Sequence, residues 1–229
     1  MLEAVIFDFN GVIIDDEHLH CELFQELARP YGIELTIEAY NDHYLVYDDV
    51  SCFEHIFRDY GQPLSAPQIE ELVAKKSRRY HERLAGEMVI FPGAVDLLRR
   101  CAAEFPVAIG SGARRDEVEA VLGRLEMRQS VACIVSADDV DNGKPHPETY
   151  TRCLEGLNAA RGNESALLVA ADCVVIEDTP GGVAAARAAG MRCLAVTHSL
   201  PAERLTEADR VVYSLEGLDL RTLRELVDG

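Results

Sequence analysis

The sequence lacks any long apolar run and carries little positive charge. No apolar segment approaches the roughly 20 residues that a membrane-spanning helix needs, so no membrane span is expected. The segment Met1–Phe9 has neither a basic stretch nor a cleavage site, so no secretory signal is expected. Because 40 acidic residues outnumber 22 basic ones, the net charge of −18 argues against nucleic acid or an anionic membrane as a partner.

The sequence also lacks closely spaced cysteine pairs and contains few lysines. The seven cysteines are odd in number and never spaced as Cys-x-x-Cys, and several lie in apolar runs where a free thiol acts as a small hydrophobic group. Neither a disulfide framework nor a zinc site is expected, and a reducing cytoplasm is the expected location. Of the three lysines, Lys75 and Lys76 are adjacent, which leaves Lys144 as the isolated one.

Short apolar runs alternate with helical patterns along much of the chain. With 48% apolar and 27% charged residues, the composition is that of a soluble globular protein of one large or two modest domains. The apolar runs are Ala4–Phe7, Val107–Ile109, Ala132–Val135, Cys173–Ile176 and Cys193–Val196. Helical patterns cover residues 94–104, 116–125 and 179–189. This alternation predicts an α/β fold with a doubly wound, Rossmann-like parallel sheet.

A long insertion separates the first two predicted strands. It is about 90 residues long, whereas a crossover between parallel strands needs about a dozen. Residues 15–88 have no strand pattern, and helical patterns lie at 17–28, 36–43, 49–59 and 66–84. We therefore expect an α/β core formed by residues 1–14 and 89–229, and an all-helical second domain at 15–88.

Polar residues follow four of the predicted strands. In an open parallel sheet, ligands bind beyond the carboxyl ends of the strands. The segments found there are Asp8-Phe9-Asn10-Gly11-Val12, Ser111-Gly112-Ala113-Arg114, Lys144-Pro145 and Glu177-Asp178. Capping of the next helix would explain one such acid, but it explains four strand ends together poorly. Carboxylates suit Mg²⁺, while a hydroxyl, a glycine amide and a lysine suit phosphate.

These segments together resemble the haloacid dehalogenase superfamily, in its β-phosphoglucomutase-like phosphatase branch. Asp8–Val12 is similar to the first superfamily motif, Asp-x-Asp-Gly-Thr/Val, and Ser111 matches the second. Lys144-Pro145 matches the third motif and Glu177-Asp178 the fourth, within a run at 174–183 that is close to the form found in this branch. The order, the spacing and the helical insertion agree, so the resemblance covers essentially the whole chain and identifies residues 15–88 as a cap domain.

The resemblance implies a Mg²⁺-dependent phosphatase for a small phosphorylated metabolite. Asp8 would be the nucleophile that accepts the phosphoryl group. Asp8, the main-chain carbonyl of Asn10 and Asp178 would bind Mg²⁺, with Glu177 binding directly or through water. The phosphoryl oxygens would be held by Ser111, the Gly112 amide and Lys144. Arg114, at a helix start where the dipole does not favour a cation, fits either a substrate or cap contact or plain exposure.

Asn10 departs from the family pattern. Phosphatases and mutases of the family have an aspartate there, which protonates the leaving oxygen and then activates water. An amide cannot exchange a proton at a useful pKa, although its main-chain carbonyl remains available to a metal. General acid–base catalysis is worth about 10²–10⁴ in rate, so slow turnover is expected.

Other functions stay open at this stage. A phosphonate hydrolase would need a cap lysine that forms a Schiff base, for which Lys75 and Lys76 are the candidates. A sugar-phosphate mutase is disfavoured because the cap stretch at 45–50 carries Asp48 and Asp49 where mutases place an arginine. A dehalogenase would have no use for Glu177-Asp178. A catalytically weakened phosphate-binding protein is the alternative that Asn10 suggests.

Overall fold

The computed structural model describes residues 1–45, 47–86, 88–162 and 166–228. The chain forms two compact units, a core of Met1–Ile14 with Ile90–Gly229 and a helical insertion of Asp15–Val89. Within the cap stretch at 45–50, Val46 lies outside the described residues. Among the helices described, none is both long and apolar enough to cross a bilayer.

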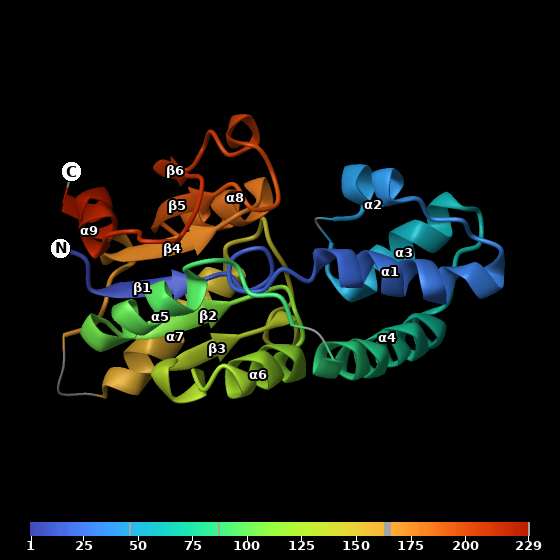
Figure 1. Cartoon of the computed structure of the whole chain (residues 1–229), viewed down its shortest axis with the longest axis horizontal. Coiled ribbons are helices and arrows are strands. Elements are labelled where there is room, and N and C mark those ends of the chain that lie inside the picture. The colour runs from blue at the N-terminus through green and yellow to red at the C-terminus, as the bar shows by residue number, and fades with distance from the viewer. Residues whose placement is uncertain (46, 87, 163–165, 229) are drawn as a thin grey trace. The chain divides into compact units, whose positions relative to one another are not determined.

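The core is built on a parallel sheet with the strand order β3-β2-β1-β4-β5-β6 (Figure 1). The strands are β1 Ala4–Phe7, β2 Val107–Gly110, β3 Cys133–Val135, β4 Cys173–Glu177, β5 Arg192–Val196 and β6 Arg210–Val212. The five predicted strands are present, and the doubly wound α/β fold is confirmed. β6 was not predicted because none of its three residues is fully buried, so it gives a weak apolar signal.

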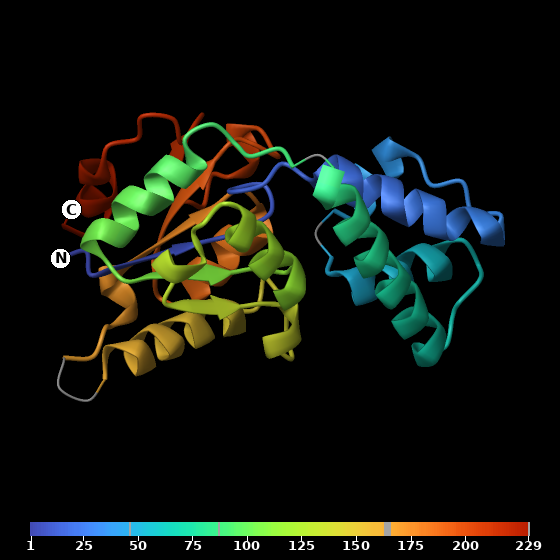
Figure 2. The ribbon, with the colours of Figure 1, turned by 60° about the horizontal axis from the view of Figure 1, so that its bottom comes forward.

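Helices cover both faces of this sheet. The core helices are α5 Ala94–Glu104, α6 Arg115–Arg124, α7 Glu148–Arg161, α8 Pro180–Ala188 and α9 Leu220–Asp228. α7 and α8 pack on one face, where Ile6 and Val175 of the sheet share a core with Leu157 and Val183. Figure 2 shows α5 on the opposite side of the sheet from α7. Helices on both faces explain why the central strands are apolar throughout.

The strand order places a switch point between β1 and β4. From β1 the chain winds through β2 to β3 at one edge, and from β4 it winds through β5 to β6 at the other. Neighbouring strands at such a point send their connections to opposite faces, which leaves a crevice beyond their carboxyl ends. Asp8 follows β1, and Glu177 ends β4.

In the described residues of the insertion, the regular structure is helical. Its helices are α1 Glu17–Ala28, α2 Ile37–His43, α3 Asp49–Asp59 and α4 Ala66–Gly86, close to the predicted ranges. It has a separate apolar core in which the rings of Phe24 and Phe53 meet edge to face at 4.7 Å. Asp48 caps α3 by accepting a hydrogen bond from the backbone N–H of Ser51 at 2.9 Å.

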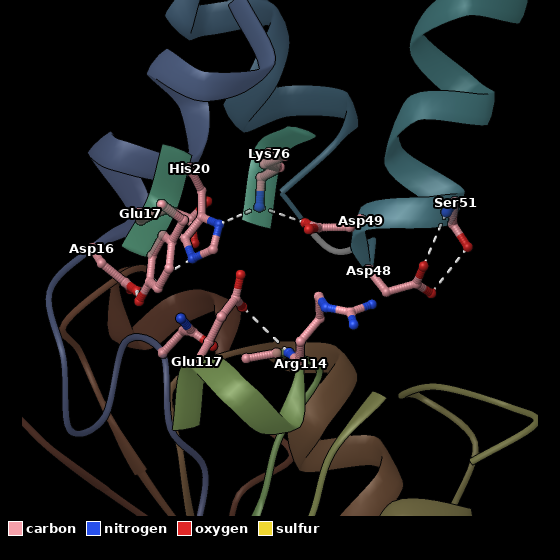
Figure 3. Close-up of polar contacts among 12 residues, drawn as sticks. Asp16, Glu17, His20, Asp48, Asp49, Ser51, Lys76, Arg114 and Glu117 are labelled. Carbon is pink, nitrogen blue, oxygen red and sulfur yellow. Dashed lines mark hydrogen bonds and ion pairs between the residues drawn. The ribbon is translucent and has the colours of Figure 1, made fainter. Parts of the chain in front are cut away.

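A buried cation lies inside this insertion. Lys76 on α4 is wholly buried, and its Nζ lies 2.6 Å from Asp49 Oδ1 and 2.6 Å from His20 Nδ1 (Figure 3). Because an ammonium group only donates, His20 Nδ1 is an acceptor, and its Nε2 carries the hydrogen that faces Asp16 Oδ2 at 3.2 Å. The network therefore joins α1, α3 and α4.

Lys76→Met should destabilise the insertion, because it leaves the Asp49 carboxylate without its cation. Removal of one partner from a buried pair typically costs about 3 kcal/mol. Lys75→Met is the matched control: Lys75 is half exposed and pairs with Glu71, so its loss should cost less than about 1 kcal/mol. Thermal unfolding followed by circular dichroism compares the two variants, and equal effects would contradict a structural role for the Lys76 pair.

Candidate active site at the carboxyl ends of β1 and β4

Three carboxylates converge at the switch point. Asp8, Glu177 and Asp178 are all buried, and each offers an oxygen within 4.8 Å of the other two. Asp178 Oδ1 is buried and has no hydrogen-bond partner among the described residues. An unpartnered buried carboxylate oxygen beside two more carboxylates is costly without a cation. The all-oxygen donor set is the type that Mg²⁺ prefers.

Lys144 is the cation that the chain itself supplies to this cluster. Its Nζ lies 2.8 Å from Asp8 Oδ1 and 2.6 Å from Glu177 Oε1. The ammonium group also lies 4.9 Å from the centre of the Tyr150 ring. Lys144 thus offsets part of the negative charge and links the residue that follows β1 to the residue that ends β4.

Glu177 is anchored on both of its carboxylate oxygens. Oε1 accepts from Lys144 and from the hydroxyl of Tyr150 at 2.7 Å. Oε2 accepts from the backbone N–H of Asp178 at 2.9 Å, and from the N–H and hydroxyl of Thr179 at 3.0 and 3.1 Å. A full set of donors fixes the Glu177 carboxylate, which in turn fixes Lys144.

The crowding shifts the pKa values of the three acids in different directions. Burial, together with the charge of Glu177, raises the pKa of Asp8 to about 7 against the opposing effect of Lys144. Burial and the neighbouring carboxylates raise the pKa of Asp178 well above its ordinary value. Burial would also raise the pKa of Glu177, but Lys144 and Tyr150 hold it below its ordinary value. Glu177 is therefore the most readily ionised of the three.

The second predicted motif lies beside the first. Ser111 follows β2 and is almost wholly buried, and its hydroxyl donates to Asn10 Oδ1 at 3.4 Å. The same hydroxyl accepts from the backbone N–H of Ala113 at 3.0 Å. A Cβ atom on Gly112 would meet nothing within 4 Å, so there is open space beside its backbone. Such a hydroxyl and exposed glycine backbone suit an anion.

Arg114 is the predicted site residue that the structure does not bring into the cluster. It immediately precedes α6, where its guanidinium forms ion pairs at 3.4 Å with Asp116 and at 3.4 Å with Asp138. Its side chain is half exposed. These two acids explain the cation at the helix start without any ligand.

Four residues near the acidic cluster were not predicted from the sequence. They are Tyr150, Thr179, His198 and Ser199. Tyr150 lies on α7, for which no helix was predicted. The other three follow strands, and the strand-end rule, if applied to β5 as well, points directly to Thr197-His198-Ser199.

Comparison with known proteins gives a family and a fold. Residues 2–190 match the family model described as haloacid dehalogenase-like hydrolase. The chain is 31% identical over 235 residues to a phosphorylated carbohydrates phosphatase of Thermotoga maritima, covering 99% of this chain and 100% of that protein. It is 28% identical over 216 residues to validoxylamine A 7'-phosphate phosphatase of Streptomyces hygroscopicus subsp. limoneus, covering 94% and 95%.

A similar fold is known from a solved structure. β-Phosphoglucomutase from Clostridium difficile matches with a TM-score of 0.87 and 24% identity, covering 100% of this chain and 98% of that one. At this identity the likeness establishes the fold alone.

Mg²⁺ binding should weaken as the pH falls below about 7, because the pKa of Asp8 lies at about 7 and a protonated carboxyl is a poor ligand. Each bound ion must then displace at least one proton, so affinity should fall about tenfold per pH unit. The stability of the metal-free protein should change with pH in the opposite direction to the Mg²⁺ affinity. Since folding raises the pKa of Asp8 from 3.8, the metal-free protein should lose stability as pH rises from about 4 to about 7.

Isothermal titration with Mg²⁺ at constant ionic strength, between about pH 5.5 and about pH 8.5, measures the affinity. Thermal unfolding without metal over the same range measures the stability. An affinity that does not change with pH would contradict the raised pKa of Asp8.

Gly182→Ala should disrupt the site, whereas Gly181→Ala should not. A Cβ on Gly182 would lie 1.6 Å from Glu177 Oε1, whereas one on Gly181 would meet nothing within 4 Å. The first variant must displace the Glu177 carboxylate, and with it Lys144. The second gains helix propensity worth up to about 1 kcal/mol in α8. Unfolding curves and Mg²⁺ titrations of both variants test this, and indistinguishable variants would refute the packing argument.

Proposed function

The chain belongs to the haloacid dehalogenase-like hydrolase family, and from this premise we propose that it is a Mg²⁺-dependent phosphatase that uses Asp8 as its nucleophile on a small phosphorylated metabolite. The observation that carries the proposal is the contact of Lys144 with Asp8 and Glu177 inside a buried cluster of three carboxylates. A cluster of this kind favours a divalent cation and a phosphoryl group over an apolar ligand.

The relatives support a phosphate monoester as substrate. One is named for phosphorylated carbohydrates and another for validoxylamine A 7'-phosphate. We infer a hydroxyl-rich phosphate ester for this chain as well.

The residues present fit a magnesium ion. Asp178 Oδ1 is a buried oxygen without a partner in the described part of the chain, and Asp8 is the second carboxylate at the same place. We assign direct ligation to Asp8, Asp178 and the main-chain carbonyl of Asn10. Glu177 already accepts hydrogen bonds on both oxygens, so we assign it the anchoring of Lys144. The bound ion would supply positive charge to the transferring phosphoryl oxygens.

The protein's own residues carry out the phosphoryl transfer and the hydrolysis that follows. A carboxylate oxygen of Asp8 attacks phosphorus, the bond from phosphorus to the ester oxygen breaks, and the electron pair leaves with that oxygen. Ser111, the Gly112 amide and Lys144 hold the phosphoryl oxygens during transfer. Water then attacks the aspartyl-phosphate, which releases inorganic phosphate and restores the carboxylate. Arg114 has no assigned part in these steps, because its acidic neighbours occupy it.

Because of Asn10, proton transfer to the leaving oxygen and proton transfer from the attacking water are both slow. Its side-chain oxygen accepts from Ser111, and an amide can neither protonate the leaving oxygen nor take a proton from water. Substrates whose leaving groups need no proton, such as aryl phosphate esters and acyl phosphates, should therefore turn over faster than sugar phosphates.

The alternative enzymes receive less support from the insertion. A phosphonate hydrolase needs a lysine whose amine can reach a carbonyl, but Lys76 is wholly buried against Asp49, and Lys75 pairs with Glu71. The mutase alternative lacks a cation at the cap stretch, where Asp48 caps α3. A phosphate-binding protein without turnover remains the alternative that the next experiment separates.

Asn10→Asp should increase turnover of phosphate esters by about 10²-fold, because it adds the missing acid and base. The main-chain carbonyl is unchanged, so Mg²⁺ affinity should change little. Phosphate release from p-nitrophenyl phosphate and from a panel of sugar phosphates, at saturating Mg²⁺, measures the effect.

Asn41→Asp, on the exposed surface of α2, is the matched control and should behave as the wild type. The wild-type protein must be fresh and checked by mass spectrometry, because the Asn10-Gly11 pair is prone to deamidation. An Asn10→Asp protein that folds, binds Mg²⁺ and gains no activity would refute the phosphatase and favour the binding protein.

A further inference from the structure

The segment that follows β5 contacts both halves of the acidic site. His198 Nδ1 lies 2.8 Å from the main-chain oxygen of Gly11, in the turn after β1. The hydroxyl of the next residue, Ser199, donates to Asp178 Oδ2, after β4. Two consecutive side chains thus touch the two segments that carry Asp8 and Asp178. Neither residue belongs to the four motifs identified above.

His198 helps to fix the orientation of the peptide groups around Gly11. A carbonyl oxygen only accepts, so His198 Nδ1 carries the hydrogen in this contact. On the other side of the residue, the N–H of Gly11 donates to the main-chain oxygen of Ile14 at 2.9 Å. Because a trans peptide is planar, this bond directs the Asn10 carbonyl the opposite way. Both peptide groups that flank Gly11 are therefore held.

A second contact holds the His198 ring in place. The imidazole stacks on Phe91 with ring centres 3.9 Å apart and planes 11° from parallel. The backbone N–H of Phe91 in turn donates to the main-chain oxygen of Ile13 at 3.1 Å. His198 is thus clamped between a ring and the turn that it stabilises.

Ser199 distinguishes between the two oxygens of Asp178. Oδ2 accepts the hydroxyl of Ser199, while Oδ1 is the buried oxygen without a partner among the described residues. Gly11 leaves room for this arrangement, since its φ is +76° and a Cβ there would lie 1.9 Å from Asp178 Oδ2. With Oδ2 engaged, the carboxylate cannot rotate freely, and Oδ1 is the oxygen left for a ligand.

We propose that His198 and Ser199 are positioning residues for the cation site, in which Ser199 orients the Asp178 carboxylate and His198 orients the turn that carries the Asn10 carbonyl. The inference rests on the proposed function, because it assigns Asp178 and Asn10 as Mg²⁺ ligands. Groups that orient metal ligands by hydrogen bonds typically affect metal affinity by about 10–100-fold.

Ser199→Ala tests the first half of the proposal. It should weaken Mg²⁺ binding about tenfold in isothermal titration of the metal-free protein, without a large loss of stability, because the residue is exposed. Ser199→Thr keeps the hydroxyl and should restore the affinity. Ser214→Ala, the same change at another exposed serine of the core, should bind Mg²⁺ as the wild type does.

His198→Phe and His198→Asn test the second half. Phenylalanine keeps a ring that can stack on Phe91 but has no donor for Gly11, so Mg²⁺ affinity should fall about tenfold. Asparagine places an amide N–H near the position of Nδ1 and should retain more of the affinity. In all weakened variants, phosphate release should recover towards the wild-type rate as the Mg²⁺ concentration is raised.

The outcomes separate this proposal from the proposed function. If the wild type binds Mg²⁺ and both Ser199→Ala and His198→Phe bind it equally well, the positioning role is wrong and the phosphatase proposal stands. If the variants lose activity that no Mg²⁺ concentration restores while their Mg²⁺ affinity is unchanged, the positioning role is also wrong. A wild type that takes up no Mg²⁺ overturns both proposals.

Discussion

The candidate active site depends on one ammonium group buried between two carboxylates. Lys144 contacts Asp8 and Glu177, and its removal would leave three buried acids without a cationic partner among the residues that the structure describes. The neighbouring residues hold Glu177 in the position that this contact requires. Tyr150 and Thr179 saturate Glu177, and the missing side chain of Gly182 leaves space for its carboxylate. The strand order then determines where the charges meet, because β1 and β4 are neighbours at the switch point.

The sequence was sufficient to predict the core sheet and to place most of the candidate site residues at one edge of it, for a topological reason. A parallel sheet brings the carboxyl ends of all its strands to one edge, so residues far apart in the chain can be placed together without coordinates. This is why Asp8, Ser111 and Glu177 could be predicted, and membership of the haloacid dehalogenase-like family is confirmed. Arg114 shows the limit of the rule, because its acidic partner Asp138 lies in a short 3-10 helix after β3, whose position the sequence pattern does not specify.

The sequence did not predict the contacts that hold the site residues in position. Tyr150 reaches Glu177 from α7, and nothing in the spacing of its neighbours indicates that its hydroxyl points to the sheet edge. His198 acts on a main-chain carbonyl, which is chemically the same at every residue and therefore leaves no signature at position 11. Asn10 illustrates the same distinction. Its main-chain carbonyl is present whatever the side chain, whereas the proton transfer that the resemblance implies at this position depends on the side chain alone.

Charge balance finally suggests an order of binding. The sequence holds three lysines, and in the described insertion Lys76 pairs with Asp49 and Lys75 with Glu71. With all three acids ionised, the three carboxylates and Lys144 have a formal charge of −2, and the raised pKa values of Asp8 and Asp178 show that the metal-free site disfavours this state. One Mg²⁺ would bring this local charge to zero and would also engage the buried Asp178 oxygen. For the proposed phosphatase we therefore expect the metal to bind before the phosphate ester, because the ion favours the ionised acids and brings positive charge to a chain with a net charge of −18.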